Sequence, residues 1–63
     1  MTELQRKIAT LMKVAGVKVE ACQRAMSWLK TEEQQVEMLK FLEENPTTTN
    51  LEVMIKTKEI IEK

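Results

Sequence analysis

Apolar side chains recur along this chain at helical spacing, and short polar breaks divide the pattern into four stretches. The first stretch follows Thr2, which can cap a helix, with Gln5 completing a capping box. It ends at Gly16, a residue suited to the left-handed turn after a helix, where Val17 can close the apolar contact. Its apolar stripe is Leu4, Ile8, Leu11, Met12 and Ala15. The spacing predicts a helix over about 3–15.

A second stripe predicts a helix over about 18–29. Its members are Val19, Cys22, Ala25, Met26 and Leu29, widened by Ala21 and Trp28. Thr31 then begins the sequence TEEQ, a second capping box with Gln34 at the third helical position. The link between this helix and the next is therefore very short.

The third stretch, over about 32–44, has apolar side chains around more than half of a helical circumference, namely Val36, Met38, Leu39, Phe41 and Leu42. A helix with so broad an apolar surface is expected to be central and covered on several sides. Pro46 forces Asn45 out of the helical region and ends it.

The fourth helix is predicted over about 50–62, capped by Thr49 with Glu52 as a third capping box. Its apolar residues also spread over a wide arc: Leu51, Val53, Met54, Ile55, Ile60 and Ile61. Two such arcs exceed what one small core can cover, which favours a homodimer. The expected fold is all-α, a single domain over 1–63 built as a compact bundle of four short helices with a helix-turn-helix-like corner.

The inventory of reactive groups argues against an enzyme. The chain has no His, all ten acidic residues are Glu, and Cys22 is the one cysteine. The usual general base and transition-metal ligand are therefore missing, and no internal disulfide can form. Cys22 lies on an apolar stripe, where a buried thiol is expected. We expect no catalytic residues, no metal, no cofactor and no small-molecule substrate.

The net charge of zero hides an uneven distribution. Residues 1–30 hold six basic side chains against two acidic ones, a net charge of +4, and residues 31–63 hold four against eight, a net charge of −4. The basic half and a tryptophan at the edge of its stripe define the candidate interaction surface: Arg6, Lys13, Lys18, Arg24, Trp28 and Lys30.

These features favour a small non-enzymatic protein-interaction or regulatory (adaptor) domain, acting as a homodimer with an unidentified protein partner. No apolar run reaches the roughly 18–20 residues of a membrane span, so no membrane partner is expected. The polar start with Glu3 is unlike a signal peptide, and with the lone cysteine it points to the cytoplasm.

The stretch EMLKFLEENPTTTNLEVMIK, residues 37–56, resembles the opening of a helix-turn-helix or winged-helix domain. That resemblance implies an alternative function as a DNA-binding transcriptional regulator, with Thr47, Thr48, Thr49 and Asn50 near base edges. The corner is acidic, however, and DNA binding needs several cations on one surface. We therefore favour a hinge between helices, with nucleic acid as the less favoured partner.

Overall fold

A computed structural model describes residues 2–62 and contains four helices within that range. They are α1 (Glu3–Val14), α2 (Val19–Trp28), α3 (Glu32–Glu44) and α4 (Asn50–Ile61). The predicted all-α bundle of four short helices is confirmed, and each predicted helix end lies within one residue of the observed end.

Side-chain caps fix the starts of three helices. Thr2 with Gln5 and Thr31 with Gln34 form the two predicted capping boxes, in which each side chain bonds the backbone of the other residue. At α4 the Thr49 hydroxyl accepts from the Glu52 N–H at 3.2 Å, which confirms the cap. The Glu52 carboxylate accepts from the Thr49 hydroxyl at 3.2 Å, whereas in a capping box it would accept from the Thr49 backbone.

The end of α1 is a Schellman motif. Gly16 has φ +89°, its N–H donates to the Lys13 carbonyl at 3.1 Å, and the Val17 N–H donates to the Met12 carbonyl at 2.9 Å. Val17 is buried against the core, so the predicted apolar contact is confirmed. This motif turns the chain sharply from α1 into α2.

Gly16→Ala should lower the free energy of unfolding by about 1 kcal/mol, because an L-residue is strained at this positive φ. A Cβ at this position would meet no atom within 4 Å, so the cost is one of backbone conformation alone. Gly16→Asn is the matched control and should cost less, since Asn tolerates the left-handed region. Urea unfolding followed by far-UV circular dichroism measures both, and equal losses would contradict this explanation.

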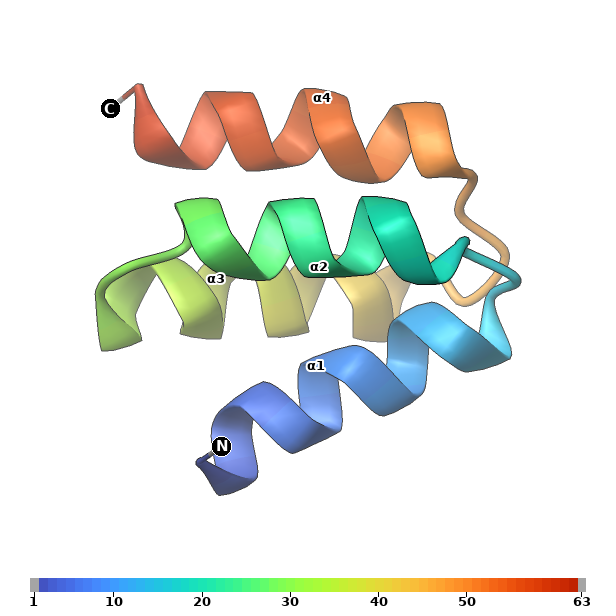
Figure 1. Cartoon of the computed structure of the whole chain (residues 1–63), viewed down its shortest axis with the longest axis horizontal. Coiled ribbons are helices and arrows are strands. Elements are labelled where there is room, and N and C mark those ends of the chain that lie inside the picture. Colours follow the sequence, from blue (N-terminus) through green and yellow to red (C-terminus); the bar gives the residue numbers. More distant parts are fainter. Residues whose placement is uncertain (1, 63) are drawn as a thin grey trace.

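The four helices form a square in cross-section. α1 packs against α2 and α3, and α4 packs against the same two, so α2 and α3 lie across one diagonal. Figure 1 shows that α1 and α3 run in one direction and α2 and α4 in the other, with α1 inclined to the rest. Neighbours α1 and α3 are therefore parallel, as are α2 and α4. Each half of the chain forms an antiparallel hairpin, and the two hairpins pack side by side.

The short link between α2 and α3, residues 29–31, crosses this diagonal. Two glutamines on α3 form hydrogen bonds with it. The Gln34 carbonyl oxygen accepts from the backbone N–H groups of Lys30 and Thr31, at 3.0 and 3.2 Å. The buried Gln35 amide donates to the Leu29 carbonyl at 3.0 Å, which satisfies an acceptor at the end of α2. Leu29 itself is buried, so the link is part of the core.

At the opposite end of the bundle, one hydrogen bond joins the two hairpins. The backbone N–H of Lys18, which precedes α2, donates to the side-chain oxygen of Asn50 at the start of α4, at 2.9 Å. Lys18 has no side-chain cap of its own for α2. A residue from the other hairpin therefore contacts the backbone at the start of α2, which sequence spacing alone does not reveal.

The core is narrower than the apolar stripes predict. It consists of Ile8, Met12, Val17, Ala25, Leu29, Met38, Leu42, Val53 and Ile60. Four stripe residues are instead exposed: Val19 at 70%, Val36 at 37%, Leu51 at 70% and Ile55 at 50%. Val19 and Leu51 lie in the first turns of their helices, at the end of the bundle. The expectation that α3 is covered on several sides is wrong in part, because it packs only against α1 and α4.

Two threonines are buried in different hydrogen-bonding states. The Thr57 hydroxyl donates to the Val53 carbonyl within α4 at 2.7 Å. The Thr48 hydroxyl, in the turn before α4, has no hydrogen-bond partner among the described residues, although the side chain is only 3% exposed. A buried hydroxyl without a partner has lost its hydration without compensation.

Thr48→Val should therefore raise the free energy of unfolding by about 1 kcal/mol, because it replaces that hydroxyl with a methyl group of similar size. Thr57→Val is the control: it removes a buried hydrogen bond and should lower stability by about 0.5–1 kcal/mol. Chemical denaturation of both variants tests this, and a loss of stability in Thr48→Val equal to that in Thr57→Val would refute it.

Candidate interaction surface

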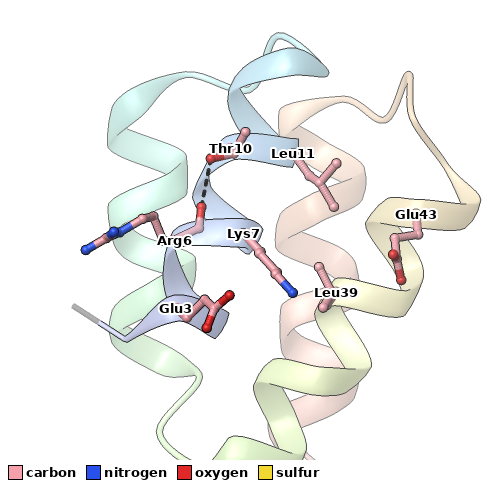
Figure 2. Close-up of a pocket in the computed structure, with 7 residues that line it drawn as sticks. All are labelled: Glu3, Arg6, Lys7, Thr10, Leu11, Leu39 and Glu43. Carbon is pink, nitrogen blue, oxygen red and sulfur yellow. Dashed lines mark hydrogen bonds between the residues drawn. The ribbon is translucent and has the colours of Figure 1, made fainter.

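A groove runs between the parallel helices α1 and α3. It consists of two adjoining hollows of about 710 and 730 Å³, and both hollows are lined by Glu3, Lys7 and Leu39. The first extends to Leu11 and Glu43, as Figure 2 shows. The second extends to the start of α3. We refer to the two hollows together as the α1–α3 groove.

The floor of the groove is apolar. Leu4 and Leu11 come from α1, and Val36 and Leu39 come from α3. The leucines pack against the core on their inner side but remain only partly buried, and Val36 is 37% exposed. These side chains lie at the edges of their helical stripes, since Ile8 and Met38 occupy the centres. The two helices thus bury the centres of their apolar stripes in the core, while the side chains at the stripe edges remain partly exposed.

The rim of the groove carries equal numbers of both charges. Its acidic residues are Glu3, Glu32 and Glu43, and its basic residues are Arg6, Lys7 and Lys30. In Figure 2 the Lys7 ammonium extends toward α3, whereas the Arg6 guanidinium points away from Leu39 and Glu43. The rim is therefore neutral as a whole, with no single-sign field to attract an exclusively anionic or cationic ligand.

The polar groups of the groove include hydroxyls used within the fold and charged side chains on its rim. Its two hydroxyls are used within the fold: that of Thr10 donates to the Arg6 carbonyl at 2.9 Å, and that of Thr2 accepts from the Gln5 N–H at 3.2 Å. The carboxylates and ammonium groups lie on open helix faces, where they are solvated. An apolar floor with a mixed charged rim is the ordinary composition of a protein–protein contact.

Trp28 lines a separate hollow of about 500 Å³ between the end of α2 and the end of α4. The indole is half-buried, with Lys30, Lys58 and Ile61 around it. Thr31 and Gln34 also line this hollow, but their polar groups already form the cap of α3. They are thus committed to the fold and leave this hollow few groups that could orient a ligand.

A third exposed region lies on α4, beside α3. The Lys56 ammonium lies 5.7 Å from the centre of the Phe41 ring and 3.7 Å from the Glu59 carboxylate. Ile55 lines the adjacent shallow hollow. Lys56 thus shields part of the aromatic surface, and Leu51 and Ile55, one helical turn apart, remain exposed on the outside of α4.

The predicted interaction residues do not gather on one surface. Lys13 and Lys18 lie at the corner between α1 and α2, while Trp28 and Lys30 lie at the other end of α2, about 15 Å away at 1.5 Å per helical residue. Arg24 is exposed on α2 between them. Only Arg6 and Lys30 border the α1–α3 groove. Glu3, Lys7 and Glu43 also border the groove but were not among the predicted interaction residues. The i, i+4 spacing of Glu3 and Lys7 indicates that these two lie on the same face of α1.

Cys22 is partly buried against the core, and burial raises the pKa of its thiol above the ordinary value. A raised pKa keeps the group protonated at neutral pH, the opposite of an activated nucleophile. Within residues 2–62 there is also no group of three His, Cys, Asp or Glu side chains placed to hold a metal ion.

The helix-turn-helix-like corner uses its polar residues internally. Thr48 is buried, the Thr49 hydroxyl caps α4, and the Asn50 side-chain oxygen accepts from Lys18. Only Thr47 of the four candidate base-contacting residues is exposed and without such a role in the described structure. The corner is built as a hinge between two helices.

Comparison of the chain with protein-family models, with curated proteins and with solved structures finds no match. Among residues 2–62, no helix combines the length and apolar character needed to cross a membrane.

Proposed function

We propose that this protein is a small non-enzymatic protein-interaction or regulatory domain that acts in the cytoplasm as a homodimer. The observation that carries the proposal is the α1–α3 groove, whose leucines and valine are only partly covered by the fold. In a protein of 63 residues the core is thin, and burying such a floor against another protein adds to the apolar area removed from water.

The arrangement of charge supports the same function. Because each half of the chain forms its own hairpin, the basic excess of residues 1–30 lies on α1 and α2 and the acidic excess of residues 31–63 on α3 and α4. A protein with one basic and one acidic side can recognise an oppositely charged surface, including that of another copy of itself.

Sedimentation equilibrium tests the homodimer directly. We expect the apparent mass to rise with concentration from 7.3 kDa toward twice that value. A mass that stays at 7.3 kDa up to the highest concentration reached would contradict the homodimer, and a constant mass of a larger oligomer would do so as well.

DNA binding is the second candidate function, favoured by one observation. Arg6, Lys13, Lys18 and Arg24 are all exposed on the first hairpin, and such residues can contact phosphates. These residues, rather than the corner before α4, would contact the duplex. The hypothesis requires binding that is weakened by salt, because phosphate contacts release counterions.

A mobility-shift titration with random duplex DNA at low salt tests this second candidate. If it is correct, the wild type shifts the duplex, and the double variant Lys13→Glu with Lys18→Glu shifts it less. Lys40→Glu, which makes the same charge change on exposed α3, is the control and should behave more like the wild type. The absence of any shift at micromolar protein would exclude DNA binding of this electrostatic kind.

A further inference from the structure

We infer that the occupant of the α1–α3 groove is the same groove of a second copy, related by a two-fold axis that makes the paired helices antiparallel. This inference rests on the proposed homodimer and names its interface. In such an arrangement α1 faces α1 of the second copy, and α3 faces α3, so the attraction comes from the mixed charges of the two groove rims and not from the opposite net charges of the two hairpins.

The apolar floor is the first argument. Leu4, Leu11, Val36 and Leu39 belong to one groove, and a two-fold axis beside Gln5 and Val36 brings Leu4, Val36 and Leu39 of the two copies together. The other exposed apolar side chains are Val14 at the end of α1, Val19 at the start of α2, and Leu51 and Ile55 one turn apart on α4. The α1–α3 groove differs from them because its four apolar side chains come from two helices and line one hollowed surface.

The charge balance is the second argument. A two-fold interface places a surface against itself, so the surface must contain both signs of charge to be complementary. The three acidic and three basic residues of the rim meet this requirement. A purely basic or purely acidic partner would meet like charges along half of the rim.

The order of charges along the groove sets the register. In the proposed register the axis passes beside Gln5 and Val36, which line the same hollow. With the axis at that level, Glu3 and Lys7 flank it symmetrically on α1, and the Glu3 of each copy meets the Lys7 of the other. On the α3 side Lys30 lies in the link before α3 and Glu43 in the last turn of α3, on opposite sides of Val36, so the same axis directs each Lys30 toward the Glu43 of the second copy.

The first test compares two matched substitutions by sedimentation equilibrium. Val36→Glu places a carboxylate in the groove floor, and Ile55→Glu places one on the outside of α4; both positions are exposed helix positions. The dissociation constant of the dimer should rise by about tenfold or more for Val36→Glu, because symmetry places two buried charges in one interface. It should change less than about twofold for Ile55→Glu.

The second test is a charge exchange that leaves the fold of one copy intact. Lys30→Glu places an acid near the start of α3 and Glu43→Lys a base near its end, both favourable to the helix dipole. Each single variant should weaken the dimer by about fivefold, because like charges then meet across the interface, and the double variant should return to within about twofold of the wild type. Loss of affinity through simple unfolding would not be rescued in this way.

The possible outcomes distinguish an error in the proposed interface from an error in the proposed homodimer. If Ile55→Glu dissociates the dimer and Val36→Glu does not, the homodimer stands and the α1–α3 interface is wrong. If the double charge variant is no tighter than the single ones, the antiparallel register is wrong. If the wild type remains at 7.3 kDa at every concentration, both the homodimer and this inference fail. Should Val36→Glu lose its helical circular dichroism, the charge exchange alone decides.

Discussion

The hydrogen bond from the buried Gln35 amide to the Leu29 carbonyl holds the part of the chain on which the whole arrangement depends. Thr31 has extended backbone torsions, and an extended residue spans more than 3 Å, which helps this short link to reach across the bundle. Leu29 enters the core on the way, and the amide of Gln35 satisfies the carbonyl left free at the end of α2. An apolar residue at position 35 would leave that buried carbonyl without its partner, a cost of about 1–3 kcal/mol.

The groove follows from this diagonal crossing. Because α3 starts on the far side of the bundle from α2, its neighbour is α1, and the two run parallel. The hairpins then pack side by side, and the Lys18 to Asn50 hydrogen bond holds their corners together at the other end. The core is filled by the centres of the stripes, so the leucines at their edges line the outside of the α1–α3 contact. The surface proposed for dimerisation thus results from the path of the link between α2 and α3.

Sequence reasoning succeeded where the decisive interactions are local. The caps at Thr2 and Thr31 and the left-handed turn at Gly16 each involve residues within one helical turn, and all three were predicted. The apolar pattern wrongly placed Val19 and Leu51 in the core. Periodicity gives the direction of a side chain but not how far the neighbouring helices extend. Sequence reasoning also missed buried Gln35, because a polar residue joins a core only when a partner outside its own turn is available.

The sequence by itself determined the number of helices, their ends and the division of charge between the two halves of the chain. These properties depend mainly on capping side chains, on Gly16 and Pro46, and on composition, although the start of α2 also has a tertiary partner in Asn50. Only the tertiary structure decided which helices are neighbours, which edges of the stripes remain uncovered and which charges share a rim. Those properties depend on contacts between residues distant in sequence, such as Lys18 with Asn50, and no local spacing encodes them.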